Sequence, residues 1–204
     1  MNLEIFEQVK ADLKEIFPPE TDEPRFRYVK QTWIFPNHFD ITVRFAKQLA
    51  EKYGADVQVC MLAALLHDAG LAYKRDRADS VGHEERSVEY VYEFLPKYGY
   101  DADTVKAVAD SVIATEPKTE VATIEAKVVR TADALAHIQS VHYLAKAVFS
   151  PTWDDAIAFV ERKVHADFDK ICFEDERIKI EPIYNYFVSI IEQYRGNNII
   201  NLSS

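Results

Sequence analysis

Two adjacent polar residues at the end of an apolar segment, His67 and Asp68, are the side chains of this chain best suited to chemistry. The apolar run CMLAALL precedes them and Gly70 follows, which places the pair where a buried helix would end. An imidazole and a carboxylate are costly to bury without a strong partner, and a divalent cation is such a partner. His38 upstream and Asp133 downstream also lie on segments with a helical pattern. Together the four residues predict a mixed nitrogen and oxygen metal site.

A ligand set of this kind suits Mn²⁺, Fe²⁺, Co²⁺, Ni²⁺, Zn²⁺ or Mg²⁺, and the sequence does not choose among these ions. Neighbouring residues on a helix point about 100° apart, so His67 and Asp68 reach one ion most easily at a helix end. Gly70, directly beyond the pair, is where the chain can turn away. We expect His38 and Asp133 to converge on the same ion from two other helices. Such a site leaves coordination positions for water and for a substrate oxygen.

The elements that must position these residues have a helical pattern almost throughout. Apolar residues recur at helical spacing from Leu3 to Phe17, and a Pro-Pro pair at residues 18–19 ends that helix. Asn37 is expected to cap the second helix, and Asp56 and Asp101 to cap the third and fifth. The predicted helices cover residues 3–17, 38–53, 57–68, 83–98, 102–115, 121–149, 153–169 and 182–195.

This pattern predicts an all-α fold, an orthogonal bundle of about eight helices. One domain is expected over residues 1–204, with a core at 30–150 and a C-terminal helical hairpin at 151–195. Residues 71–81 are expected to form a surface loop, and the tail at 196–204 is expected to fray. Residues 173–181 are charged and poorly periodic, so no regular structure is predicted for them.

The composition excludes several classes of function. The net charge of −10 argues against a broad surface for duplex nucleic acid, because phosphate contacts need clustered Lys and Arg. No apolar run approaches the roughly 20 residues that a membrane helix needs. The first residues lack the charge pattern of a secretory signal, so we expect a cytoplasmic protein. Of the two cysteines, Cys60 opens the apolar segment and is expected to be a buried free thiol.

The order His38, His67-Asp68, Asp133, with the segments MLAALLHDAG and KVVRTADALAHI, resembles the HD superfamily of metal-dependent phosphohydrolases. The resemblance covers about residues 38–142. It implies an all-α fold and a divalent metal ion held by these four residues. It also implies hydrolysis of a small phosphorylated substrate, which could be a phosphomonoester, a phosphodiester or a nucleotide phosphate.

The chain also departs from patterns common in that superfamily. Many members place an acidic residue or a lysine shortly after the HD pair, and residues 69–73 offer neither. Members with two metals add further histidines, and His83 matches the first such position. The second position falls near residues 112–116, which contain no histidine, although Glu116 could donate an oxygen. We therefore expect one divalent ion per chain.

The chemistry that follows is hydrolysis by a metal-activated water. Asp68 could orient or deprotonate that water, and His83 could donate a proton to the leaving oxygen or reach a second metal. Lys74, Arg75 and Arg77 could hold substrate phosphates, although a mixed-charge loop of this kind is more often merely solvated.

Other interpretations of individual residues stay open. His137, four residues after Asp133, could flank the site or be a packed or surface residue, while His142 and His165 are expected to be structural or solvent-facing. The C-terminal aromatic residues either pack the last helix or form the face of a homodimer.

The competing functions belong to other classes of protein. One is a catalytically weak sensor that keeps the metal and binds a phosphorylated ligand, and another is a diiron oxygenase. A purely structural helical interaction module would leave the position of His67 and Asp68 unexplained.

Overall fold

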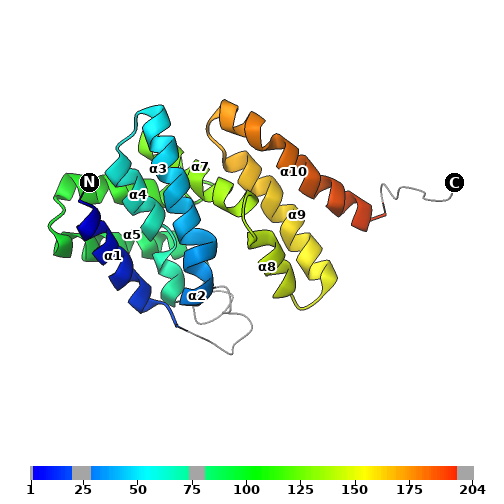
Figure 1. Ribbon diagram of the computed structural model, residues 1–204, viewed down its shortest axis with the longest axis horizontal. Helices are drawn as coiled ribbons and strands as arrows, with labels where there is room; N and C mark the ends of the chain where they lie inside the picture. The colour runs from blue at the N-terminus through cyan, green and yellow to red at the C-terminus, as the bar shows by residue number, and fades with distance from the viewer. Residues whose placement is uncertain (1, 20–28, 74–80, 197–204) are drawn as a thin grey trace.

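The computed structural model describes residues 2–19, 29–73 and 81–196, and all regular structure within these ranges is helical (Figure 1). The all-α fold class predicted from the sequence is therefore confirmed. The α-helices are α1 (Leu3–Ile16), α2 (Gln31–Ile34), α3 (Asp40–Tyr53), α4 (Val57–Leu66), α5 (His83–Phe94), α6 (Ala102–Ile113), α7 (Ile124–Ile138), α8 (His142–Val148), α9 (Trp153–Lys170) and α10 (Glu174–Tyr194). Three short helical turns differ from the α-helix: η2 (Phe35–Phe39) is a π turn, and η3 (Ala69–Tyr73) and η5 (Leu95–Tyr98) are 3₁₀ turns.

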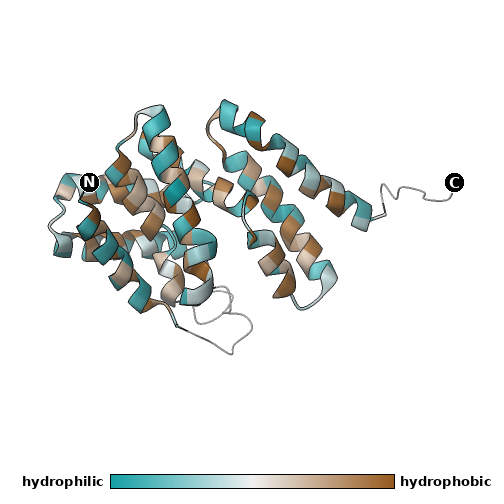
Figure 2. Ribbon diagram, in the orientation of Figure 1, coloured by the Kyte–Doolittle hydropathy of each residue, from teal (hydrophilic) through white to brown (hydrophobic). Residues whose placement is uncertain are grey.

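Helix α4 is the centre of the core, because each of its residues from Val59 to Leu66 is buried. Helices α3, α6 and α7 pack against it. The predicted cap is present, since the Asp56 carboxylate accepts the backbone N–H groups of Gln58 and Val59 at 2.8 and 3.1 Å. Cys60 is a buried free thiol, as expected. The surrounding helices alternate teal and brown around their axes, as amphipathic helices do (Figure 2).

The second predicted helix begins earlier than residue 38. Helix α2 starts at Gln31 and runs through the π turn η2 into α3, so Asn37 is not an N-cap. The Asn37 side-chain amide donates instead to the Trp33 carbonyl at 3.0 Å. The wider turn accommodates Pro36, which lacks an N–H and would clash within a regular helix. The Asn37 prediction was wrong because the helical segment already begins at Gln31, so Asn37 lies within it.

The long helix predicted over residues 121–149 is divided into α7 and α8. The break falls at residues 139–141, where the Ser140 hydroxyl accepts the backbone N–H of His142 at 3.1 Å. Helix α10 covers residues 173–181 in large part, contrary to the expectation of no regular structure there. Its first turn is acidic, which favours a helix N-terminus, and Lys52 of α3 pairs with Glu176 at 2.6 Å.

The helices lie in two groups with α7 between them (Figure 1). Helices α1 to α6 lie on one side, while α8, α9 and α10 lie on the other, and α9 packs against both α7 and α8. The single domain over residues 1–204 and its division at residue 150 stay predictions. No helix in the described part of the chain combines the length and hydrophobicity required to cross a membrane.

Candidate metal centre

Three buried side chains from three elements meet at one point. His38 comes from the π turn η2, His67 ends α4, and Asp133 lies within α7. The Nε2 atoms of His38 and His67 are 3.0 Å apart, and each lies 3.5 Å from Oδ1 of Asp133. These three residues form a group whose ligand atoms all lie within 4.8 Å of one another.

Asp68 lies beside this group and contacts both histidines. Its Oδ2 atom is 3.4 Å from Nε2 of His38 and 3.7 Å from Nε2 of His67. Its Oδ1 atom lies 3.1 Å from Nε2 of His83, the first residue of α5. The structure thus brings together the four predicted ligands, which we call the HD cluster (His38, His67, Asp68 and Asp133), and sets His83 next to it.

The donor atoms of the HD cluster fit a divalent ion. Bonds of about 2.0 to 2.2 Å to nitrogen and oxygen would set neighbouring ligand atoms roughly 3 to 3.6 Å apart, close to the separations observed here. Oδ1 of Asp133 is buried without a hydrogen-bond partner, although it faces two imidazole nitrogens. Buried polar atoms are normally satisfied, and a cation between these three atoms would satisfy all of them.

The tautomer of His67 also suits ligation. Its Nδ1 lies 2.9 Å from the carbonyl oxygen of Ala64 in the preceding turn, so Nδ1–H donates there. The lone pair of Nε2 is then directed toward the cluster, which is the usual arrangement of a metal-binding histidine. Burial, together with the nearby His137, lowers the pKa of His38 to about 4, so this ring is neutral and able to bind a metal ion at neutral pH.

The carboxylates of the HD cluster are ionised. Burial opposes the charge on Asp133, but His137, Lys170 and His67 outweigh burial and hold the pKa of Asp133 well below its usual range. At His83, burial is outweighed by hydrogen bonds to Asp68 and Glu84, which raise the pKa of His83 to about 10. His83 is therefore a cation at neutral pH, held between two carboxylates.

Four further residues around Asp133 were not predicted to belong to the site. Lys170 of α9 pairs with Oδ2 of Asp133 at 3.2 Å, and the buried Asp167 lies 3.3 Å from Nδ1 of His137. Lys163 contacts both His137 and Asp167, and the hydroxyl of Tyr143 donates to Asp167 at 2.8 Å. The signal in the sequence was the placement of charged residues at positions 163, 167 and 170, which form one face of an amphipathic helix.

Two of the remaining histidines belong to the site. The His137 ring stacks on the His38 ring with centroids 4.5 Å apart, so His137 flanks the site, one of the two interpretations left open. His142 lies 4.1 Å from the His137 ring, and its Nε2 atom is buried without a hydrogen-bond partner. His142 also lines the cavity, and its interpretation as structural or solvent-facing stays a prediction. His165 is exposed on α9 and contacts Tyr184, as expected.

Other predicted site residues do not join the HD cluster. Oε2 of Glu116 accepts the backbone N–H of Lys118 at 2.7 Å, and the side chain is absent from the described lining of the cavity. A second metal site through Glu116 finds no support in the described residues. Lys74, Arg75 and Arg77 lie outside the described residues.

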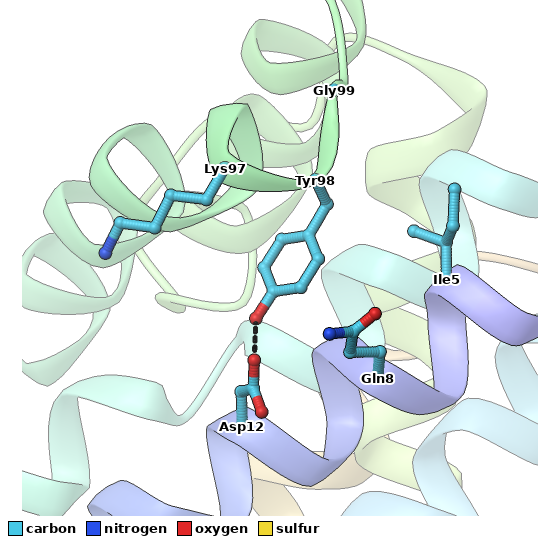
Figure 3. A pocket seen from close by; sticks show the side chains of 6 residues that line it. All are labelled: Ile5, Gln8, Asp12, Lys97, Tyr98 and Gly99. Carbon is cyan, nitrogen blue, oxygen red and sulfur yellow. Dashed lines mark hydrogen bonds between the residues drawn. The ribbon is translucent and has the colours of Figure 1, made fainter.

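The HD cluster opens into a large cavity between the two groups of helices. The cavity has a volume of about 1180 Å³, and α8 and α9 form one of its walls. Four cationic side chains on that wall line it: Lys146, Arg162, Lys163 and Lys170. A smaller hollow of about 460 Å³ lies between α1 and η5, where Tyr98 donates to Asp12 (Figure 3). That hollow lies away from the HD cluster, and none of the residues lining it belongs to the cluster.

Comparisons with known proteins agree with this geometry. The family model of the HD domain matches residues 37–138. No curated protein matches the chain. A predicted HD superfamily hydrolase from an uncultured Thermotogales bacterium has a similar fold, with a TM-score of 0.60 and 22% identity over 96% of this chain and 98% of that chain. YpgQ of Bacillus subtilis is similar over 96% of both chains, with a TM-score of 0.67 and 20% identity. A second structure of YpgQ, in complex with ADP, has a TM-score of 0.66 and 20% identity over 99% of this chain and 98% of that chain.

Proposed function

The chain belongs to the HD domain family, and from this we propose that it is a metal-dependent phosphohydrolase that cleaves a small phosphate ester, a nucleotide or a related metabolite. One observation carries the proposal. Oδ1 of Asp133 is buried without a hydrogen-bond partner and faces Nε2 of both His38 and His67 at 3.5 Å. This is a donor set for one divalent ion, with Asp68 as the fourth ligand. The complex of YpgQ with ADP supports a nucleotide as the ligand.

The residues around the HD cluster have distinct roles in this proposal. His38, His67, Asp68 and Asp133 would hold a divalent ion, which would lower the pKa of a bound water and polarise a phosphoryl oxygen. Asp68 lies at the edge of the cluster, where its carboxylate can orient a water molecule and accept its proton. His83 holds Asp68 in place with a hydrogen bond of 3.1 Å and, as a cation, is able to give a proton to a leaving oxygen.

Lys170 has a supporting part because it neutralises the oxygen of Asp133 that faces away from the two histidines. Lys74, Arg75 and Arg77 remain candidates for contacts with substrate phosphates, and the cations on the α8 and α9 wall are further candidates. Association of two copies through the last helix is also kept as a proposal, since Tyr186 and Tyr194 of α10 are exposed by 62% and 50%.

The alternative function is a sensor that binds a phosphorylated ligand with little turnover. The segment after the HD pair favours it, because η3 (Ala69–Tyr73) contains no charged residue that could assist catalysis. Such a protein would keep the metal and the cavity but release no phosphate.

The test is phosphate release from a panel of nucleotides and simple phosphate esters with Mn²⁺, Mg²⁺, Co²⁺ or Zn²⁺ added. We expect hydrolysis by the wild type and a loss of at least about a hundredfold in Asp68→Asn. Asp169→Asn is the matched control, because Asp169 is exposed on α9 and absent from the cavity lining. Ligand binding without release of phosphate would support the sensor, and hydrolysis that survives in Asp68→Asn would contradict the site.

A further inference from the structure

We propose that Arg162 and Lys146, on the cavity wall formed by α8 and α9, bind a second phosphate group of the ligand, and we call this pair the outer anion site. The substrate class would then be a phosphate ester that carries two or more phosphate groups. This inference rests on the proposed function only in placing the reacting phosphate at the HD cluster. The outer anion site itself is argued from the residues of α8 and α9.

One face of α9 lines the cavity from the HD cluster outward. The residues on that face recur every three or four positions, and they are Asp155, Ala158, Phe159, Arg162, Lys163, Ala166 and Lys170. Two of them are alanines, and Ala145 of α8 is a third small residue in the lining. Small side chains keep space open along the wall, while the long cationic side chains beside them reach into that space.

The cations nearest the HD cluster are already neutralised. Lys170 pairs with Asp133 at 3.2 Å, and Lys163 pairs with the buried Asp167. Arg162 makes no ion pair with any carboxylate in the described ranges, and its guanidinium instead lies 5.5 Å from the centroid of the Phe159 ring. The charge of Arg162 is thus available to a ligand.

Lys146 of α8 lies near the same aromatic ring as Arg162. Its Nζ lies 5.7 Å from the centroid of the Phe159 ring, so two cations contact one ring. A single ring stabilises each cation only modestly. An anion that contacts both side chains would be attracted by two positive charges. Helix α9 also contributes the carboxylate of Asp155 to the lining. Its Oδ2 atom accepts a hydrogen bond from the Thr152 hydroxyl at 2.8 Å.

The position of Arg162 sets the size of the ligand. Arg162 and Lys170 are eight positions apart on α9, which corresponds to about 12 Å along a helix axis. A ligand with its reacting phosphate at the HD cluster must therefore extend well beyond that phosphate to meet Arg162. Guanidinium groups bind phosphate oxygens in a two-point contact. A ligand whose reacting phosphate lies at the HD cluster offers such oxygens to Arg162 only if it carries a further phosphate group.

The experiment is isothermal titration calorimetry of the full chain, as purified and without added metal, with inorganic tripolyphosphate and with inorganic monophosphate. We expect the affinity for tripolyphosphate to be at least about tenfold lower in Arg162→Ala than in the wild type. Arg162→Lys should recover part of the lost affinity. Monophosphate binding should change less than twofold in both variants. Lys146→Ala should weaken tripolyphosphate binding in the same direction.

Arg177→Ala is the matched control, because Arg177 of α10 lies 4.6 Å from the centroid of the Phe168 ring and is absent from the cavity lining. Equal binding of tripolyphosphate to the wild type and Arg162→Ala would overturn the outer anion site, even if the enzyme hydrolyses esters. Weaker binding in Arg162→Ala would support the site even if no ester were hydrolysed, so this inference and the proposed function fail separately. An equal loss in Arg177→Ala would also overturn the inference.

Discussion

Asp167 offers a sharp test of how the charges around the HD cluster are balanced. Its carboxylate has no exposed area, and it receives hydrogen bonds from Lys163 and from the Tyr143 hydroxyl. The substitution Asp167→Asn keeps the shape of the side chain and an oxygen that can accept from Tyr143. It removes the charge and leaves the ammonium group of Lys163 beside His137 without its anion.

The expected loss of stability in Asp167→Asn follows from the pKa of the Asp167 carboxyl group. Burial opposes ionisation, but Lys163 and His137 outweigh it and lower the pKa of Asp167 from 3.8 to about 2. At about 1.4 kcal/mol per pKa unit, the charge stabilises the folded state by about 2 kcal/mol. Removing one partner of a buried ion pair lowers the free energy of unfolding by about 3–5 kcal/mol. Because Lys163 is partly exposed, we expect the loss in Asp167→Asn to lie at or below the lower end of that range. We expect the thermal midpoint to fall by about 5–10 °C.

The assay is urea unfolding of the wild type and Asp167→Asn as a function of pH. Because folding lowers this pKa, the stabilisation is complete above about pH 4 and is lost as the pH falls toward 2. The difference in the free energy of unfolding between the two proteins should therefore be constant from about pH 5 to 8 and should shrink below pH 4. Asp169→Asn, on the exposed face of the same helix, is the control and should change stability by less than about 0.5 kcal/mol. Equal stability of Asp167→Asn and the wild type at pH 7 would refute the reasoning.

Three further outcomes are expected. Elemental analysis should find about one divalent ion per chain in the wild type and less than about a tenth of that in Asp133→Asn, because the substitution removes a charged ligand. His83→Gln should lower kcat by about 10²–10⁴ and leave the metal content unchanged, since His83 contacts Asp68 rather than the ion. Gly70→Ala should lower the thermal midpoint measured by calorimetry by several degrees, because a Cβ atom there would lie 2.2 Å from the carbonyl oxygen of His83.

The sequence predicted the fold class and the members of the HD cluster because both depend on local signals. A buried apolar helix that ends in two polar residues is visible in the chain without knowledge of its neighbours, and Asp56 shows that helix caps are equally local. The start of α2 was missed because Asn37 is a favourable N-cap residue, whereas a π turn that accommodates Pro36 continues the helix across this position. The division of the helix predicted over 121–149 was missed because residues 139–141 contain neither proline nor glycine.

The balance of charge in the site could not be predicted, because it depends on which helix packs against α7. Asp133 and His137 share a helix, and their spacing predicts that they lie on one face. Nothing in that spacing indicates that Lys170 and Asp167 would meet them from a helix some thirty residues further along the chain. The same long-range packing makes Arg162 and Lys146 part of the wall of a cavity that His38 and Asp133 also line.

Helix α9 supports the HD cluster, although no member of the cluster lies on it. The HD cluster is made by η2, α4 and α7, yet the oxygen of Asp133 that faces away from the two histidines is neutralised by Lys170 of α9. Without α9, the buried carboxylate of Asp133 would lose its ion pair with Lys170, and His137 would lose its contact with Asp167. The site therefore extends beyond the residues matched by the HD domain family, and the helices that follow residue 138 take part in holding it together.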